Sequence, residues 1–274
     1  MGCATIPERL PAFDRINRRA YQQRGVLRQF GAASGWLEPG ERLAVELVAE
    51  AARDAPVLDI GIGGGRTAPL LRQISADYRG IDYTPAMVAV ARRRYPDAVF
   101  LEMDARKLAF PDDSFALAVF SYNGIDSIDL GGRRQVLQEV FRVLRPGGCF
   151  VFSALNRRNA PAAGHWPDWT VFRDAGRSPA GWLRAIARLL VGGLNRLRRA
   201  RLFRAGLNVA VGQIAAHNFS LVTLFVSLEE QLKELRSAGF SVEAIFAPDG
   251  TPVPVDGAQA GDAPWYNYVV RKPG

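Results

Sequence analysis

A run of glycines directly after an apolar strand restricts the fold of this chain more than any other feature. Residues 57–60 (Val-Leu-Asp-Ile) are predicted to form a buried strand, and Gly61, Gly63 and Gly65 lie in the next five residues. Glycine lets the backbone turn sharply and approach a ligand closely. The turn also occurs in dinucleotide-binding domains, so by itself it indicates an α/β ligand site and no particular ligand.

Apolar runs alternate with helical patterns on both sides of this turn, which is typical of parallel βαβ units. Between the fourth and fifth strands, Val136, Val140 and Leu144 are spaced as one face of a helix, and residues 145–148 (Arg-Pro-Gly-Gly) should end it. The predicted strands are residues 57–60, 78–81, 98–101, 116–120, 149–152, 240–246 and 265–271. We therefore predict a doubly wound, mostly parallel sheet of seven strands.

The length of 274 residues fits one α/β domain with an addition better than two full domains. The alternation breaks after the fifth strand and resumes with a helix at residue 227. Residues 156–226 are therefore expected to be a helical and loop insertion that caps the site. The core is then formed by residues 56–155 and 227–274, preceded by an N-terminal helical segment, residues 1–55.

Three carboxylates lie at the carboxyl ends of successive strands of the predicted sheet. They are Asp59, Asp82 and Asp104, and Asp82 lies 21 residues after Gly61. An acidic side chain at that spacing can accept hydrogen bonds from both ribose hydroxyls of a nucleotide. Ligands of open α/β sheets bind at the carboxyl ends of the strands, which favours a binding role for all three over that of chance surface charges.

These motifs, in this order, resemble the class I S-adenosylmethionine-dependent methyltransferases. The resemblance also rests on residues 110–115 (Phe-Pro-Asp-Asp-Ser-Phe) and on the turn at 145–148, and it covers about residues 55–155 well. It implies a Rossmann-like methyltransferase fold and S-adenosyl-L-methionine as cofactor. No metal is expected, because the sequence has no metal-ligand spacing. The last 45 residues match the family more weakly.

The resemblance also implies a role for each motif residue. Asp59 would orient the glycine loop and the cofactor amino group, Asp82 would bind the ribose, and Asp104 would accept from the adenine amine. Segment 1–55 would fold over the cofactor. The full set of expected cofactor contacts is Asp59, Gly61, Gly63, Gly65, Asp82, Tyr83, Met87, Asp104, Ala105, Ser121 and Tyr122.

The reaction that this family performs requires few catalytic side chains. Methyl transfer needs a nucleophile held in line with the methyl group, about 3 Å away, and a proton acceptor where one is required. Tyr21, Asn123 and His217 are the candidates: an aromatic face for the sulfonium, a polar contact and a base near neutral pH. His165 is a second candidate base. Each of these four could instead have only a packing or hydrogen-bonding role.

The acceptor is expected to be a small, secondary-metabolic molecule methylated at oxygen, nitrogen or carbon. The loop at residues 121–126 lacks the Asn- or Asp-Pro-Pro-Tyr motif of some amine methyltransferases, which argues against nucleic-acid bases and peptide amines. The alternative is a cyclase or lyase of the same fold, in which the cofactor amino group attacks its own γ-carbon to give azetidine-2-carboxylate and methylthioadenosine. A non-catalytic binding module is disfavoured by the intact glycine loop.

The charge of the chain gives weaker information about partners. The formal net charge is +8, but almost all cations are arginine, which often reflects genomic base composition, so nucleic acid is not favoured. Residues 182–204 form a basic amphipathic stretch that could rest on an anionic membrane. Its position favours a lid over the site instead, and Gly192 and Gly193 are expected to interrupt it as a helix.

Neither cysteine is expected to form a disulfide or bind a metal. Cys3 lies near the terminus, and Cys149 lies in an apolar strand pattern where a thiol acts as a small hydrophobic group. The N-terminus lacks the apolar segment of a secretory signal, so a cytoplasmic protein is expected.

Overall fold

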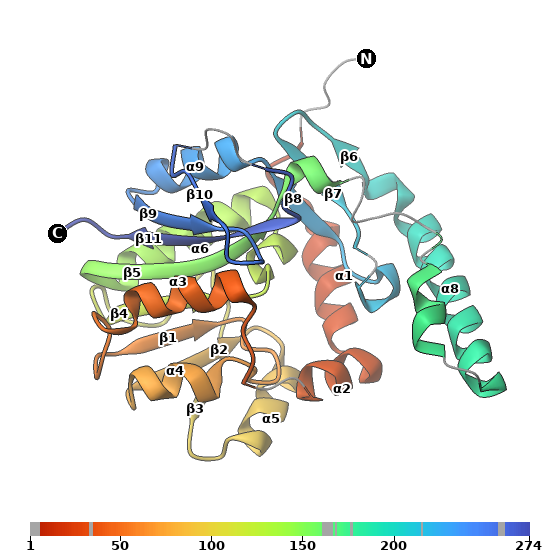
Figure 1. The fold of residues 1–274 in the computed structure, drawn as a ribbon, viewed down its shortest axis with the longest axis horizontal. Coiled ribbons are helices and arrows are strands. Elements are labelled where there is room, and N and C mark those ends of the chain that lie inside the picture. The colour runs from red at the N-terminus through yellow and green to blue at the C-terminus, as the bar shows by residue number, and fades with distance from the viewer. Residues whose placement is uncertain are drawn as a thin grey trace.

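The structure is a computed structural model of the chain. It describes residues 6–32, 35–160, 167, 169–175, 178–214, 216–256 and 261–274. A central sheet runs through the molecule with helices on both faces, and a second, smaller sheet lies beside it (Figure 1). This is the doubly wound α/β fold that the sequence predicts.

The central sheet has the strand order β10-β9-β11-β5-β4-β1-β2-β3. Strands β1 to β5 run parallel to one another. Strand β11 pairs antiparallel with β5 and with β9, so the C-terminal strands form an antiparallel edge. The sheet has eight strands where seven were expected, because the short strand β10 pairs with β9. The strands are β1 (Val57–Ile60), β2 (Tyr78–Asp82), β3 (Val99–Glu102), β4 (Phe115–Phe120), β5 (Leu144–Leu155), β9 (Ser241–Phe246), β10 (Pro252–Val253) and β11 (Trp265–Arg271).

Two apolar clusters hold the helices on the sheet. Helices α3 (Pro39–Ala49), α4 (Ala68–Ile74) and α5 (Pro85–Arg94) pack on one face, and α6 (Leu130–Val143) and α9 (Leu228–Ser237) pack on the other. Because both faces are covered, β1 and β4 are buried along their whole lengths and consist almost entirely of apolar residues. The carboxyl ends of these strands are left to form a site.

One predicted boundary is wrong. The helix that precedes the fifth strand ends at Val143, and residues 145–148 already belong to β5. Leu144, expected on the helix, pairs with Phe115 of β4 instead. Gly147 and Gly148 are held by backbone hydrogen bonds to Lys272, so the turn residues extend the strand after ending the helix.

The insertion, residues 156–226, contains one long helix and a three-stranded antiparallel sheet in the order β6-β7-β8. Helix α8 (Pro179–Arg199) runs unbroken through Gly192 and Gly193, which were expected to interrupt it. Both glycines are buried, and α8 packs against η5 (Ala216–Phe219), where Asn195 Nδ2 donates to Asn218 O (2.9 Å). The other elements are η2 (Arg157–Asn159), η3 (Trp169–Ala175), η4 (Ala200–Leu202), β6 (Arg204–Ala205), β7 (Val209–Gly212) and β8 (Thr223–Val226).

The N-terminal segment begins with α1 (Pro11–Tyr21) and α2 (Arg24–Ala32). Helix α1 packs on the small sheet: Phe13 shares an apolar cluster with Val211, Val222 and Leu224. The start of the chain and the insertion therefore form one body beside the core (Figure 1). In the part of the chain that the structure describes, no helix combines the length and hydropathy needed to span a bilayer. Cys149 is buried and free, and Cys3 lies outside the described residues.

Candidate active site

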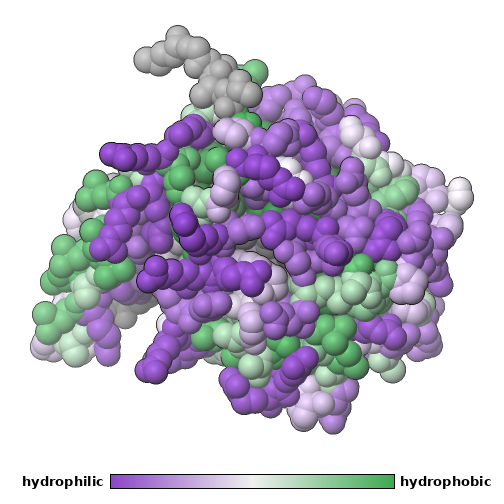
Figure 2. Space-filling model, turned by 180° about the vertical axis from the view of Figure 1, so that it is seen from behind, coloured by the Kyte–Doolittle hydropathy of each residue, from purple (hydrophilic) through white to green (hydrophobic). Residues whose placement is uncertain are grey.

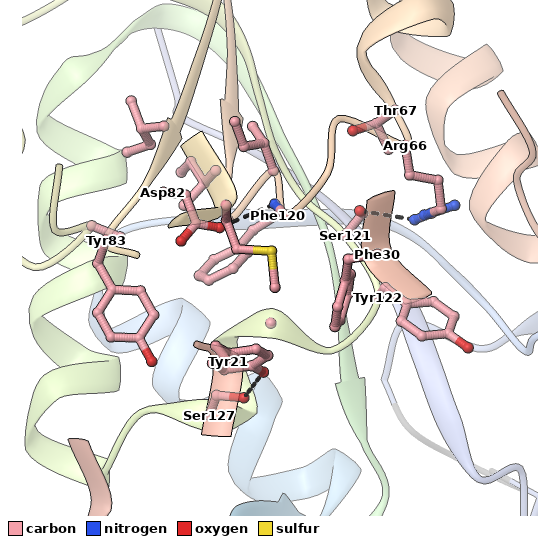
Figure 3. Close-up of a pocket in the computed structure, with 18 of the residues that line it drawn as sticks. Tyr21, Phe30, Arg66, Thr67, Asp82, Tyr83, Phe120, Ser121, Tyr122 and Ser127 are labelled. Carbon is pink, nitrogen blue, oxygen red and sulfur yellow. Dashed lines mark hydrogen bonds between the residues drawn. The ribbon is translucent and has the colours of Figure 1, made fainter. Parts of the chain in front are cut away.

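A cavity of about 210 Å³ opens at the carboxyl ends of β1, β2 and β4. Figure 3 shows side chains from α1, α2 and these strand ends around one space. Nine of the expected cofactor contacts line it: Gly61, Gly63, Asp82, Tyr83, Met87, Asp104, Ala105, Ser121 and Tyr122. Tyr21 lines it as well, whereas Asp59, Gly65 and Asn123 do not. The strand-end residues singled out by sequence thus lie together.

The glycine loop forms one wall of the cavity, and side chains of other elements pack so close to it that only glycine fits at these positions. Gly61 and Gly63 have positive φ values of 64° and 54°, which L-residues with a Cβ rarely adopt. A Cβ on Gly61 would lie 2.5 Å from Cε2 of Phe120, and one on Gly63 would lie 3.0 Å from Cδ1 of Phe30. The loop therefore presents bare backbone to the cavity, which suits close contact with a ligand.

Asp82 ends β2 with its carboxylate in the cavity wall (Figure 3). Its oxygens accept hydrogen bonds from the backbone N–H of Gly63 (3.0 Å) and of Thr84 (2.8 Å). Burial raises its pKa, and these two hydrogen bonds oppose the rise. Each carboxylate oxygen has a further lone pair, so Asp82 can still accept from two hydroxyl groups of a ligand. This fits the ribose contact that the family resemblance implies.

Asp59 lies behind the loop with one oxygen unpaired. Oδ2 accepts from Thr67 Oγ1 (2.6 Å) and Tyr78 Oη (2.8 Å), whereas the buried Oδ1 has no hydrogen-bond partner among the described residues. Burial raises the pKa of Asp59 to about 6, against the lowering effect of both hydroxyls. An unpaired buried carboxylate oxygen fits a cationic amino group nearby, although Asp59 does not itself line the cavity.

Asp104 is engaged by a neighbouring guanidinium. Arg106 Nη2 lies 2.6 Å from Asp104 Oδ2, and Arg106 Nη1 lies 2.5 Å from Asp14 Oδ2 of α1. Burial alone would raise the pKa of Asp104, but its hydrogen bonds to Arg106 lower it. This pair of ion pairs ties α1 to the end of β3, and an adenine amine would have to share Asp104 with Arg106.

Aromatic rings from the N-terminal helices cover the cavity. Tyr21 lies edge-on to Phe30 and Tyr83, with ring centroids 6.0 and 6.4 Å away. Its hydroxyl is 2.8 Å from Ser127 Oγ, and burial raises its pKa to about 12. Tyr21 therefore stays neutral near pH 7, so it can offer a ring face or a hydroxyl but not a basic oxygen.

Arg66 is a site residue that sequence reasoning missed. It follows the glycine loop directly and forms two hydrogen bonds with Glu41 (2.7 and 3.0 Å) and one with Ser121 Oγ (2.9 Å). Its guanidinium also stacks within 4.5 Å of the Trp36 ring centroid and 5.3 Å of that of Tyr122. Trp36 and Tyr122 both line the cavity and are about half exposed, so they lie where the cavity meets solvent. Stacking on Arg66 holds the two rings in place there. An arginine directly after the glycines is the one signal that could have found it.

None of the remaining catalytic candidates is among the described residues that line the cavity. Asn123 adopts a left-handed conformation with φ of 58°, its N–H donates to Ser153 Oγ (2.7 Å), and it is absent from the lining. His217 lies in η5, and its side chain is outside the described residues, as is all of His165. Among the described residues, no group of His, Cys, Asp and Glu could hold a metal ion.

The cover that the structure shows comes from the N-terminal segment. Asp14, Tyr21, Gln29, Phe30 and Trp36 line the cavity, and no described residue of the insertion does so. The lid expected from residues 156–226 is not seen among the described residues of that segment and stays a prediction. The insertion packs on α1, which carries Tyr21, and its strand β8 contacts residues 124–127, two of which line the cavity.

Comparison with known proteins agrees with this geometry. Residues 57–148 match the family model of the methyltransferase domain. By this match, residues 57–148 of the chain are a methyltransferase domain. A demethylmenaquinone methyltransferase of Chlorobaculum tepidum is 36% identical over 113 residues, which is 40% of this chain and 46% of that protein. One of Thermus thermophilus is 34% identical over 147 residues, 52% of this chain and 60% of that protein. The chain thus spans about half the length of these relatives.

Solved structures share the fold of the methyltransferase domain over most of the chain. The 1,6-didemethyltoxoflavin-N1-methyltransferase of Burkholderia thailandensis has a TM-score of 0.57 at 16% identity, covering 100% of this chain and 95% of that one. The [4+2]-cyclase SpnF has a TM-score of 0.58 at 15% identity, covering 98% and 99%. At these identities the likeness shows the fold alone, and the names of these proteins describe different reactions.

Proposed function

We propose that this protein transfers the methyl group of S-adenosylmethionine to a small acceptor, which we take to be a secondary metabolite rather than a polymer. The observation that carries the proposal is the cavity itself: bare glycine backbone and Asp82 at one side, aromatic rings at the others. A recessed pocket of this kind admits a small molecule more readily than a polymer. The half-exposed rings of Trp36 and Tyr122 mark the side at which the acceptor would enter.

The bound cofactor supplies a methyl group already activated on a sulfonium. The chain's own residues then position the reactants: Asp82 and the glycine loop hold the nucleoside side, and the Tyr21 ring faces the cavity, where it can stabilise positive charge. The acceptor's lone pair forms the new bond to the methyl carbon while the carbon–sulfur bond breaks and its electron pair returns to sulfur. A proton on the acceptor leaves to solvent at the cavity mouth.

The relatives named demethylmenaquinone methyltransferases do not decide the acceptor. Their matches cover 40% and 52% of this chain. A quinol ring is therefore one acceptor to test, beside phenols, amines and carbon nucleophiles.

A second candidate function is favoured by the chemistry of the lining. The described carboxylates of the lining are Asp14, Asp82 and Asp104; Asp14 and Asp104 are joined through Arg106, and Asp82 lies in the implied ribose site. On the side of the cavity formed by Ser121 and Tyr122, the described lining contains no carboxylate or histidine that could act as a general base for an acceptor. A cavity with aromatic walls and no such base also suits a reaction without an acceptor, in which the cofactor's own neutral amine attacks its γ-carbon. That step would break the γ-carbon–sulfur bond, form azetidine-2-carboxylate and release methylthioadenosine and a proton.

One experiment separates the two reactions. The full chain is incubated with S-adenosylmethionine alone, and then with a panel of quinols, phenols and amines, and the products are quantified by mass spectrometry. Methyl transfer predicts S-adenosylhomocysteine only in the presence of an acceptor. Methylthioadenosine formed without one, faster than the uncatalysed background, would replace transfer by cyclisation. Failure of the cofactor to bind in calorimetry would overturn both.

A further inference from the structure

Helix α8 carries a stripe of large apolar side chains that nothing in the described structure covers. Leu183, Leu190 and Leu197 are 69%, 69% and 77% exposed, and Ile186 and Leu194 are about half exposed. The helix projects from the edge of the molecule in Figure 1, and Figure 2 shows apolar surface along that same edge, at the left in the reversed view. Single exposed leucines are ordinary, but an apolar stripe along a helix marks an interaction surface.

The stripe is not the face by which α8 packs on the protein. Its buried residues are Gly181, Ala185, Gly192 and Gly193, and Ala185 and Leu189 pack with Val171 and Phe172 of η3. With 3.6 residues per turn, Gly181, Ala185 and Gly192 lie on the opposite side of the helix from the stripe, and Gly193 lies at its edge. The exposed leucines are therefore unnecessary for holding α8 in place.

Both ends of the stripe are extended by further exposed apolar residues. Trp182 and Trp169 are 50% and 66% exposed, and both rings pack on Phe172 near the start of α8. Past the end of the helix, Leu207 is 81% exposed in the turn between β6 and β7. Tryptophan is the residue type that favours the interface between lipid and water.

The charge around the stripe is of one sign. From residue 175 to residue 228 the sequence has no aspartate or glutamate. Arg184, Arg198 and Arg201 are exposed beside or just beyond the stripe. The same stretch holds Arg177, Arg184, Arg188, Arg196, Arg198, Arg199, Arg201 and Arg204. An apolar stripe flanked by exposed arginines, in a stretch of sequence that has no acidic residue, complements a membrane surface with anionic headgroups above an apolar interior.

We propose that α8 binds an anionic phospholipid membrane and lies flat in its interface. The stripe Leu183–Leu197 would enter the boundary between headgroups and acyl chains, and Arg184, Arg198 and Arg201 would contact lipid phosphates. Helix α8 is not apolar enough to cross a bilayer, so it rests on the surface. A second copy of the chain is the less favourable occupant, because two such helices would bring their arginines together. The proposal is independent of which reaction the cavity performs.

The test is flotation of the full chain with vesicles. Two compositions are compared: phosphatidylcholine alone, and an equimolar mixture of phosphatidylcholine and phosphatidylglycerol. We expect flotation with the mixed vesicles only, weakened by salt. Leu183→Ser, Leu190→Ser and Leu197→Ser together should raise the lipid concentration for half-binding at least about tenfold. The matched control replaces the exposed Leu47, Val99 and Val255 by serine and should bind as the wild type does.

A second set of variants tests the charge. Arg184→Gln, Arg198→Gln and Arg201→Gln are compared with Arg42→Gln, Arg93→Gln and Arg236→Gln, which remove the same charge from other exposed positions. Only the first set should reduce binding, by at least about tenfold.

Three results would overturn the proposal. They are no flotation, equal binding to neutral vesicles, or equal loss in both arginine sets. A dimer in sedimentation velocity that the leucine variant dissociates, without vesicle binding, would assign the stripe to a second copy instead. Circular dichroism checks that each variant is folded.

Discussion

The side-chain amide of Asn17 forms hydrogen bonds with both the backbone C=O and the backbone N–H of Val222. Asn17 Nδ2 donates to Val222 O (2.8 Å), and Asn17 Oδ1 accepts from Val222 N (2.9 Å), across 205 residues of sequence. A third hydrogen bond runs from Asn17 Nδ2 to Ser127 O (2.9 Å). One fully buried amide thus joins α1 to the insertion and to η1 (Gly124–Ser127), beside the Tyr21–Ser127 contact of the cavity.

Replacing Asn17 by alanine should therefore loosen the cover of the cavity. The substitution leaves the backbone groups of Val222 buried and unpaired, each at a cost of about 1–3 kcal/mol. We expect the free energy of unfolding in urea to fall by about 2–4 kcal/mol and cofactor affinity to fall as well. Gln22→Ala, at the exposed end of the same helix, is the control. Unchanged stability of the Asn17 variant would show that α1 is held by its apolar contacts alone.

Asp82→Asn tests the cofactor assignment. The amide has nearly the same shape but no charge, and hydrogen bonds to charged groups contribute about 1.5–3 kcal/mol each. We expect the dissociation constant for S-adenosylmethionine in calorimetry to rise by roughly ten- to a hundredfold. Asp97→Asn, an exposed carboxylate after α5, should bind normally. Equal affinity of the wild type and the Asp82 variant would remove the ribose role from this residue.

Tyr21 offers a way to separate its ring from its hydroxyl. Tyr21→Phe keeps the ring and loses only the bond to Ser127, so it should keep most of the activity, whereas Tyr21→Leu loses the aromatic face. A cation–π contact of about 0.5–2 kcal/mol to the bound sulfonium predicts a kcat/KM for the cofactor roughly two- to thirtyfold lower for the leucine variant than for the phenylalanine variant. The pKa of Tyr21 is raised to about 12, so the wild-type pH–rate profile should show no step from this group below pH 11. Equal rates for both variants would leave Tyr21 a packing role only.

Asp59 should make stability depend on pH in a direction that can be measured. Its folded pKa of about 6 is raised by burial, above the value of about 3.9 for an unfolded chain. The folded state therefore holds the proton more tightly, and the resulting stability is complete below about pH 4 and lost as the pH rises through 6. The contribution lost by pH 7 amounts to at most about 3 kcal/mol.

The Asp59→Asn variant isolates this contribution. The difference in unfolding free energy, wild type minus variant, should decrease between pH 4 and pH 7. The corresponding difference for Asp97→Asn, a surface position, should stay flat over the same range. A wild-type advantage that grows with pH would mean that the Asp59 carboxylate is stabilised as the anion in the folded protein.

The predictable parts of the site are those encoded within one strand and its following turn. The positions of Gly61, Gly63 and Asp82 follow from strand-end spacing, because all parallel strands end at the same edge of the sheet. The contacts of Arg66 with Glu41 and Trp36 are not predictable in this way, since they join segments that share no periodic pattern. The continuity of α8 through Gly192 and Gly193 is likewise set by what packs against it, which helix propensity does not describe.

The contact between α1 and the small sheet also sets an order of events during synthesis. The residues that receive Phe13 and Asn17 lie at positions 211–226, so α1 leaves the ribosome long before its partner strands exist. Contacts of such sequence separation form late and slowly. The parallel core can be assembled with α1 held by its contacts to Arg106 and Ser127. Newly made chains therefore pass through a stage in which the cover of the glycine loop lacks its support from the small sheet, and that cover is completed only after residues 211–226 have been made.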